Sequence, residues 1–498
     1  MEAAFHPQGH LWFCLLLLFS LIIVKYSVNY SKCAHVKGPW LASVSSLWLF
    51  RATIMGRTQV DCAKALAKYG SIVRIAPSKV VTNDPLIMQY MTSPRSNFTR
   101  GPWYEAFNTT PDKTNVLSEP DEKKHMRLRA KLMRGYSGRD LPNLEQDIED
   151  RISNLLAIVE RKSTQGKPVD VAKLASYFTL DVLTQQGFEQ PVGYLKQDRD
   201  MYSFIESVKQ FAVVSELGSH FPRFQALLSS RIMAPLRPRA TDKTGLGAMM
   251  GIAMGVVAKR FAEADKAPPK MDMLGSWMRC GLSAEEAKNE AITETLGGSD
   301  STATAIRMIF LNVITNPVVY SKLMAELEGY SKPGMKQSDA KALSYLQACI
   351  KEGLRICPPL GGLGTRLPPP EGATLNGKFI PAGIEIGVNV YSAQRNQSIF
   401  GKDADIYRPE RWLCKEEGAE KLKEMEKTVD LVFSSGKYSC LGKTVAFMML
   451  DKVLPALLVN YTWACVNPAQ PMRVRCHGFY IHEDFNFLAT PRTSHGKD

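Results

Sequence analysis

One cysteine, Cys440, lies between two glycines where a turn-rich loop meets an apolar helical segment. A cysteine at the start of a helix faces unpaired backbone N–H groups and the positive end of the helix dipole, and both lower the pKa of its thiol. Gly436 and Gly442 remove side chains where a flat ring could approach the backbone. The pattern predicts that Cys440 is a thiolate ligand for haem. The alternative is a buried, inert cysteine, the commoner fate of a lone cysteine in such a loop.

A second group of reactive side chains, Asp300, Ser301 and Thr302, follows the pair Gly297-Gly298. A carboxyl group beside two hydroxyls can relay protons, as the reductive cleavage of an O–O bond requires. Two adjacent glycines inside a helix cost up to about 1 kcal/mol each relative to alanine, so we expect a close approach or a kink there. The alternative is a flexible kink with a solvated aspartate.

The helix that must position these residues has recognisable ends. Ser283-Ala-Glu-Glu286 has the spacing of a capping box and predicts its start. We expect it to run toward Thr315 and to end at Asn316-Pro317, because proline cannot continue a helix. About 30 residues of helix would measure roughly 45 Å, long enough to cross a whole domain.

Another helix is predicted by apolar residues at helical spacing from 343 to 354, before Pro358-Pro359 stops it. Glu352 and Arg355 share one of its faces. An isolated pair of this kind is more often a surface ion pair worth a few tenths of a kcal/mol.

Phe433, Gly436, Cys440 and Gly442 together resemble the haem-binding signature of the cytochrome P-450 superfamily, Phe-x-x-Gly-x-Arg-x-Cys-x-Gly. In the family the Arg of this signature pairs with a haem propionate. Tyr438 occupies that position here. Tyr can donate one hydrogen bond but carries no positive charge, so either the adjacent Lys437 supplies the charge or the other propionate partners suffice.

Three further segments resemble family motifs. Residues 297–302 resemble the oxygen-activation motif, with Ser301 replacing the first Thr and Thr302 retained. Arg411, in Arg408-Pro-Glu-Arg-Trp412, resembles the Arg that joins Glu352 and Arg355 in a buried triad behind the haem. The resemblance implies a structural role for all three. Loss of one partner would strand a buried charge at a cost of several kcal/mol.

The resemblance also implies partners for the haem propionates. His125 and Arg129 have the spacing of the family's Trp-x-x-x-Arg, with His in place of Trp. Neighbouring lysines and arginines leave a solvated basic face as the alternative for His125. Arg366, after the Pro358-Pro359 turn, matches another propionate Arg that lies in a strand.

The segments expected to shape a substrate pocket are apolar and lie at 98–116, 211–221, after Thr302, 360–363 and 478–488. An apolar pocket suggests a lipophilic substrate. The sequence singles out no specificity residue within these segments.

The composition limits the choice of partners. The 498 residues carry a net charge of +13, which suits an anionic membrane surface or an acidic protein. Nucleic acid is a poor candidate because no binding motif accompanies the charge. The ten cysteines form no compact framework, so a reducing compartment fits best.

An uncharged apolar run at 11–24 predicts one transmembrane helix. Lysines follow this run and none precedes it, which favours a signal anchor over a cleaved signal peptide. We therefore expect an anchor and linker at 1–35 and a catalytic domain at 36–498 on the cytoplasmic side of the endoplasmic reticulum membrane, crossed once.

The resemblance implies a mainly α-helical prism with small β-sheets that binds haem b, iron protoporphyrin IX. It implies a monooxygenase that activates dioxygen with electrons from NADPH, delivered by a separate membrane-bound flavoprotein reductase. Lys437, Lys443 and the basic residues around His125 are candidates for the docking face. The substrate class suggested by similarity to fungal members is a terpenoid, polyketide or alkaloid of secondary metabolism. Two alternatives stay open: a dioxygen-independent isomerase or dehydratase, and a non-catalytic membrane-anchored haem-binding protein.

Overall fold

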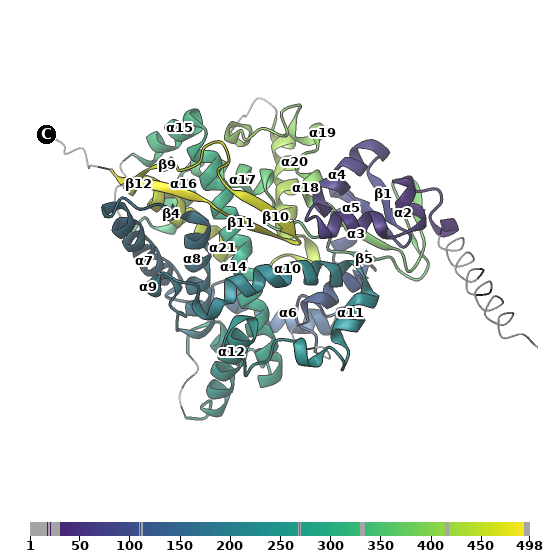
Figure 1. Cartoon of the computed structure of the whole chain (residues 1–498), viewed down its shortest axis with the longest axis horizontal. Coiled ribbons are helices and arrows are strands. Elements are labelled where there is room, and N and C mark those ends of the chain that lie inside the picture. Colours follow the sequence, from purple (N-terminus) through teal and green to yellow (C-terminus); the bar gives the residue numbers. More distant parts are fainter. Residues whose placement is uncertain are drawn as a thin grey trace, which may run out of the picture.

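The computed structural model describes residues 30–108, 110, 113–266, 268, 270–328, 334–413 and 418–492, with the single positions 17 and 20. This part of the chain is mainly helical with small sheets, as expected (Figure 1). The predicted transmembrane run at 11–24 lies outside the described residues apart from positions 17 and 20.

The α-helices are α2 (Trp40–Val44), α3 (Leu47–Ile54), α4 (Thr58–Tyr69), α5 (Pro85–Thr92), α6 (Glu122–Tyr136), α7 (Leu144–Thr164), α8 (Val171–Phe188), α9 (Tyr194–Gln197), α10 (Phe204–His220), α11 (Pro222–Ser229), α12 (Gly245–Ala262), α13 (Met273–Arg279), α14 (Ala284–Ile314), α15 (Pro317–Leu327), α16 (Gln337–Ala342), α17 (Ser344–Ile356), α18 (Val390–Ala393), α19 (Gln397–Phe400), α20 (Ala419–Val429) and α21 (Lys443–Asn460). The strands are β1 (Ile72–Ala76), β2 (Lys79–Thr82), β3 (Thr99–Arg100), β4 (Val169–Asp170), β5 (Arg366–Leu367), β6 (Ala373–Leu375), β7 (Lys378–Ile380), β8 (Glu385–Val388), β9 (Tyr461–Cys465), β10 (Arg473–His477), β11 (Phe479–Glu483) and β12 (Asn486–Pro491).

The long helix α14 has the predicted ends. The backbone N–H of Glu286 donates to the hydroxyl of Ser283, and the N–H of Ser283 donates back to the Glu286 carboxylate at 2.8 Å, which is a complete capping box. The helix ends one turn before Pro317, where Asn316 caps α15. Both predictions are confirmed. Because α14 packs against α8, α12, α17 and α21, it forms the central axis of the body.

Of the two expectations at Gly297-Gly298, a close approach or a kink, the structure shows the close approach, because α14 runs unbroken through both residues and Gly298 lies against α8. The two glycines serve different purposes. A Cβ atom at Gly298 would lie 2.9 Å from both terminal methyls of Leu183 on α8, whereas a Cβ at Gly297 would meet no atom within 4 Å. Gly298 therefore allows two helices to approach closely, and Gly297 lies beside open space.

The five-stranded sheet has the order β1-β2-β8-β5-β3 and lies with α2 to α5 at one end of the molecule (Figure 1). Its last pair, β3 and β5, is antiparallel with Arg100 opposite Arg366. The hairpin β10–β11 forms a second small sheet, and β11 packs against α14. These two sheets thus bring strands from distant parts of the chain to the helical core.

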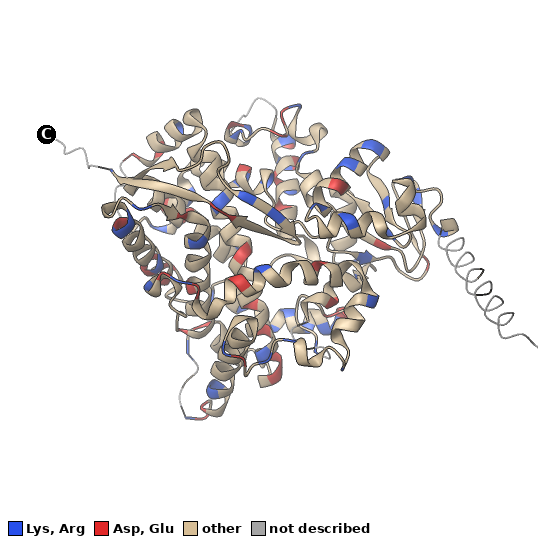
Figure 2. Cartoon of the chain, in the orientation of Figure 1, with Lys and Arg blue, Asp and Glu red and all other residues tan. Residues whose placement is uncertain are grey.

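Surface charges of both signs are interspersed (Figure 2). Within the described ranges, α12 is long and apolar enough to cross a membrane, and α14 with α15 passes the same test only as a pair bent by 104°. Because α12 packs against α10 and α14, we interpret it as a helix of the bundle.

Candidate active site

The loop that carries Cys440 leads into α21. The backbone N–H of Cys440 donates to the carbonyl of Phe433 at 2.7 Å, and Gly442 directly precedes the first turn of the helix. The predicted junction of loop and helix is confirmed. The Cys440 side chain is accessible from a cavity of about 1200 Å³ that Phe433 and Gly442 also line.

The role of Gly436 and the pKa of the Cys440 thiol differ from what the sequence predicted, whereas Gly442 leaves space as expected. Gly436 has φ = +57°, and a Cβ atom there would lie 2.0 Å from the carbonyl oxygen of Thr92. This glycine therefore serves backbone packing rather than the approach of a ring, whereas a Cβ at Gly442 would meet nothing within 4 Å. Burial raises the pKa of the Cys440 thiol and outweighs the lowering by the Gly442 N–H and the charge of Arg129.

Three arginines, Arg100, Arg129 and Arg366, line the cavity near the cysteine loop. Arg129 on α6 donates to the hydroxyl of Ser439 at 2.8 Å. The guanidinium carbons of Arg100 and Arg366 lie 4.6 and 4.4 Å from the centre of the Tyr438 ring. The Nε atoms of Arg100 and Arg366 are buried and have no hydrogen-bond partner within the described part of the chain. Because these nitrogen atoms are unused donors, the three arginines form a site that favours anions.

Arg100 was missed by the sequence analysis, which named only the segment around it. No local spacing marks this residue, because its role depends on β3 pairing with β5. Burial, together with the nearby charge of Arg366, lowers the pKa of Arg100 to about 10. A bound anion would relieve this repulsion.

His125 lies on α6 as predicted but is fully buried, with its ring 5.3 Å from the Tyr438 ring. Burial and the charges of Arg100 and Arg129 lower the pKa of His125 to about 3, so the imidazole is neutral. It is absent from the described residues that line the cavity. The solvated basic face that was the alternative for His125 is therefore excluded.

Lys437 and Tyr438 are both tied to other groups. The Lys437 ammonium donates to the carbonyls of Ser96 and Phe98 at 3.0 and 2.9 Å and lies 3.1 Å from the Glu122 carboxylate. The Tyr438 hydroxyl donates to the same carboxylate. Lys437 does not line the cavity, and the positive charges beside the Tyr438 ring are those of Arg100 and Arg366.

Asp300, Ser301 and Thr302 all line the cavity that Cys440 faces. The Asp300 carboxylate accepts from Arg307 at 3.0 Å, so it is paired and not simply solvated. The Ser301 hydroxyl donates to the carbonyl of Gly297 at 3.0 Å. The predicted acid and alcohols are thus brought to one cavity with the cysteine.

Two buried carboxyl groups of α14 were also missed. Glu290 accepts from the N–H of Val116 at 2.7 Å, and Glu294 lines the cavity. Each has one carboxyl oxygen without a partner in the ranges described. Burial raises the pKa of both side chains to about 8, so both are protonated at neutral pH. Their sequence signal was a polar residue on the inner face of α14, which periodicity alone does not separate from a surface position.

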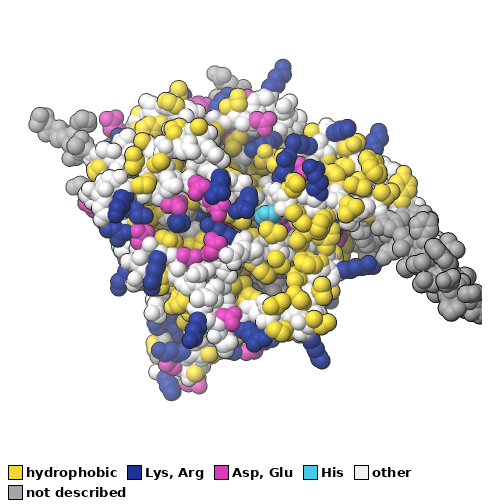
Figure 3. Space-filling model, viewed as in Figure 1, with side chains coloured by type: hydrophobic (Ala, Val, Ile, Leu, Met, Phe, Trp, Pro, Cys, Tyr) yellow, Lys and Arg dark blue, Asp and Glu magenta, His cyan; other side chains and the backbone are white. Residues whose placement is uncertain are grey.

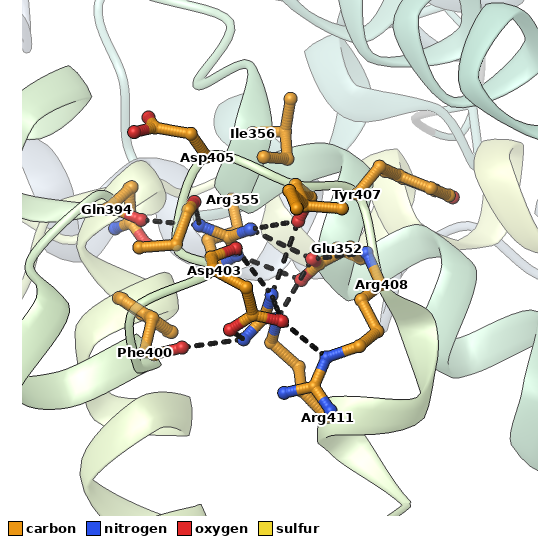
Figure 4. A network of polar contacts seen from close by, with 12 residues as sticks. Glu352, Arg355, Ile356, Gln394, Phe400, Asp403, Asp405, Tyr407, Arg408 and Arg411 are labelled. Atoms are coloured by element: carbon orange, nitrogen blue, oxygen red, sulfur yellow. Dashed lines mark hydrogen bonds and ion pairs between the residues drawn. The ribbon is translucent and has the colours of Figure 1, made fainter.

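Behind the cysteine loop, the carboxylate of Glu352 is the centre of a buried network (Figure 4). Arg355 donates to it from Nε and Nη2 at 2.9 and 2.8 Å, and Arg411 donates from Nε at 2.9 Å. The indole of Trp412 adds a bond at 2.9 Å. The predicted contacts of the triad are confirmed, and the pair is not on the surface.

All five segments expected to shape a pocket contribute to the cavity wall, among them Trp103, Phe211, Ala305, Leu360 and Ile481. Sequence analysis missed the contributions of α8 and of residues 224–254, whose apolar side chains look like ordinary core. The wall is predominantly apolar, which suits a lipophilic guest.

Comparison with known proteins decides the family. Residues 37–484 match the family model of cytochrome P-450. The chain belongs to the cytochrome P-450 family. Cytochrome P-450 monooxygenase ABA1 of Pyricularia oryzae is 36% identical over 490 residues, covering 95% of each chain. The monooxygenase aba1 of Botryotinia fuckeliana is 37% identical over 92% of this chain and 91% of its own. The monooxygenase abl1 of Leptosphaeria maculans is 38% identical over 90% and 81%.

This P-450 is therefore a haem-thiolate monooxygenase, and its described residues fit the haem. Cys440 would bind the iron, and Gly442 leaves room beside it. Arg100, Arg129 and Arg366 would hold the two propionates, because all three line the cavity and the unused donors of Arg100 and Arg366 need anionic acceptors. Arg100 thereby joins the two arginines that the sequence analysis proposed.

Proposed function

We propose that this P-450 uses dioxygen and NADPH-derived electrons to hydroxylate or further oxidise a lipophilic small molecule. The observation that carries the proposal is that Cys440 shares one apolar cavity with Asp300, Ser301 and Thr302. A protein that only rearranged its substrate, or only bound haem, would not need an acid and hydroxyls beside the thiolate.

The haem, when bound, supplies the reductive activation of dioxygen. The protein supplies binding, orientation and protons. Asp300, held in place by Arg307, accepts protons from water and passes them toward the cavity, and the hydroxyls of Ser301 and Thr302 extend the route. The Ser301 hydroxyl donates its only proton to the Gly297 carbonyl, so its lone pairs can accept a hydrogen bond, and it passes its proton onward only after rotating away from that carbonyl.

Electrons are proposed to come from a separate NADPH-dependent flavoprotein reductase. Lys123, Lys124 and Arg127 are exposed on α6, and Lys443 is partly exposed at the start of α21. These residues offer a basic docking face on the cysteine side. Lys437 is buried and is no part of this face, which corrects the earlier expectation.

We further propose a single-pass anchor in the endoplasmic reticulum membrane with the catalytic domain in the cytoplasm. Exposed apolar side chains gather over α2, α3, α10 and the segment after α11 (Figure 3), including Trp40, Leu47, Phe211, Ile232 and Leu236. Such a surface suits contact with lipid, as does the apolar composition of the run at 11–24. Fungal secondary metabolites, such as terpenoids, polyketides or alkaloids, are the proposed substrates.

The first test is the carbon monoxide difference spectrum of the reduced protein. Wild type is expected to give the red-shifted band of thiolate-ligated haem, Cys440→Ala to lose it, and Cys280→Ala to keep it. A histidine-type band in wild type would overturn the proposed ligand.

Turnover separates the three candidate functions. With reductase, NADPH and dioxygen, Asp300→Asn is expected to slow product formation by about 10²-fold and to divert electrons to peroxide. Turnover that proceeds without dioxygen would favour the isomerase or dehydratase. A protein that binds haem but transforms no substrate would favour the non-catalytic alternative.

A further inference from the structure

Besides the three propionate arginines, the cavity wall carries further basic side chains on α10, on β11 and on the segment after α11. They are Lys209, Arg237, Arg239 and His482. Lys209 is partly buried on α10 and makes no hydrogen bond or ion pair with any described residue. An ammonium group on the wall of an otherwise apolar cavity is a strong electrostatic feature.

The protonation of His482 follows from its neighbour. Arg307 lies 3.3 Å from Nδ1 of the imidazole, and because a guanidinium has only donors, Nδ1 must be the acceptor. The proton of the neutral ring is therefore on Nε2. Arg307 is itself fixed by the carbonyl of Ala172, at 3.1 and 2.8 Å, and by Asp300.

The Nε2–H of His482 is a buried donor without a partner in the described ranges. Leaving such a donor unsatisfied costs about 1–3 kcal/mol, so an acceptor is favoured beside it. Burial, the charge of Arg307 and the charge of Lys209 lower the pKa of His482, which keeps the imidazole neutral and this donor in place. Lys209 and His482 line the same cavity, and the charge of Lys209 acts on the imidazole.

Negative charge that could cancel these basic side chains is scarce among the described residues that line the cavity. Two described carboxyl groups line the cavity, Asp300 and Glu294. Asp300 is paired with Arg307, and burial raises the pKa of Glu294 to about 8. The cavity therefore carries an excess of positive charge beyond the propionate site, and this favours an anionic guest.

We propose that the substrate is a lipophilic carboxylic acid whose carboxylate binds the ammonium of Lys209 and the Nε2–H of His482. This inference rests on the proposed oxidation of a lipophilic molecule and names its class. The hydrocarbon part of the acid lies along the apolar wall. The carboxylate then satisfies both unused donors at once.

Binding of three matched probes to the haem-loaded full chain tests the inference: laurate, methyl laurate and dodecane. The shift of the Soret band on titration gives each dissociation constant. Wild type is expected to bind laurate at least tenfold tighter than methyl laurate, and methyl laurate about five- to tenfold tighter than dodecane.

Three variants assign the contacts. Lys209→Met should abolish the preference for laurate over its ester, and the matched control Lys173→Met, outside the cavity, should preserve it. His482→Phe should weaken both oxygen-bearing probes about five- to tenfold and leave dodecane unchanged, whereas His482→Gln, which retains an N–H donor, should restore part of the loss. The carbon monoxide band of each variant verifies folding.

The inference is overturned if wild type shows no preference for laurate, including the case in which no probe binds, or if Lys209→Met keeps the preference. Binding tests the preference for an acid, and turnover tests the proposed oxidation, so the two claims can fail independently. Laurate held through Lys209 but never oxidised would refute the proposed function alone, while oxidation of neutral hydrocarbons without acid preference would refute this inference alone.

Discussion

At the scale of the residue, two carboxyl groups that are similarly buried differ in how many hydrogen-bond donors surround them. The Glu352 carboxylate accepts five hydrogen bonds, three of them from guanidinium groups. Glu294 accepts one bond, from its neighbour Thr295 at 3.3 Å, and has one oxygen without a partner among the described residues. Burial penalises a charge unless donors replace the lost water. Five donors surround Glu352, whereas Glu294 has few, and burial raises the pKa of Glu294 to about 8, so it keeps its proton at neutral pH.

Glu352→Gln should therefore be strongly destabilising. It leaves the buried guanidinium groups of Arg355 and Arg411 without their anion, at a cost of about 3–5 kcal/mol. Urea unfolding of the purified protein measures the loss. The control Asp405→Asn removes an ion pair whose carboxylate is 75% exposed and should cost less than about 1 kcal/mol. Equal effects would contradict a bracing role for the triad.

Glu294→Gln should change the pH dependence of stability. The folded-state pKa of about 8 exceeds the unfolded value of roughly 4.3, so the folded protein holds a proton that the unfolded chain releases between these pH values. Stability from this group is full below pH 4.3 and is lost as the pH rises to 8. The variant should gain on the order of 1 kcal/mol or more over wild type at pH 8 and little at pH 5.

Urea unfolding at the two pH values checks this, with Glu286→Gln as control. The pKa of Glu286 is lowered overall. Burial raises it, but the hydrogen bonds from Ser283 and Lys131 lower it by more. The control variant should lose stability at neutral pH. A Glu294→Gln gain that is the same at pH 5 and pH 8 would contradict the protonated state.

At the scale of the element, the contact between α8 and α14 decides where the cavity can lie. Both glycines border the cavity, but Gly298 also brings the two helices together over Leu183, whereas a Cβ atom at Gly297 would meet no atom within 4 Å. Two adjacent positions on one helix therefore differ completely in what a methyl group would meet. The helix is continuous through both, so neither glycine is needed for a bend.

Gly297→Ala and Gly298→Ala form a matched pair. Each gains up to about 1 kcal/mol in helix propensity. At Gly298 the new methyl would overlap both methyls of Leu183, which is buried, and overpacking typically costs 1–3 kcal/mol. Gly298→Ala should therefore be less stable than Gly297→Ala by about 1 kcal/mol or more in urea unfolding. The reverse order would show that α8 shifts freely.

At the scale of the whole molecule, three segments far apart in the sequence supply the cations near the cysteine loop: β3, α6 and β5. Their convergence is a property of the tertiary fold, because the positive charges repel one another until an anion joins them. Arg100→Gln should release haem about tenfold faster than wild type, as the loss of a charge-assisted hydrogen bond predicts.

Transfer of haem to an excess of a haem scavenger, followed by absorbance, measures this rate. Arg127→Gln on the exposed face of α6 is the control and should leave the rate unchanged. An Arg100→Gln protein with intact folding and wild-type haem retention would remove Arg100 from the propionate site.

The sequence by itself determined the local patterns: the capping box of α14, the loop with Cys440, the Glu352–Arg355 spacing and the acid with its two hydroxyls. These depend on contacts within a few residues, where helix geometry and the chemistry of each side chain leave little choice. The tertiary structure alone decided which side chains face the cavity. Pairing of β3 with β5 places Arg100 on the cavity wall, whereas Lys437 pairs with Glu122 and does not line the cavity. Burial also set the protonation of Glu294 and His482, because desolvation depends on neighbours that no local spacing reveals.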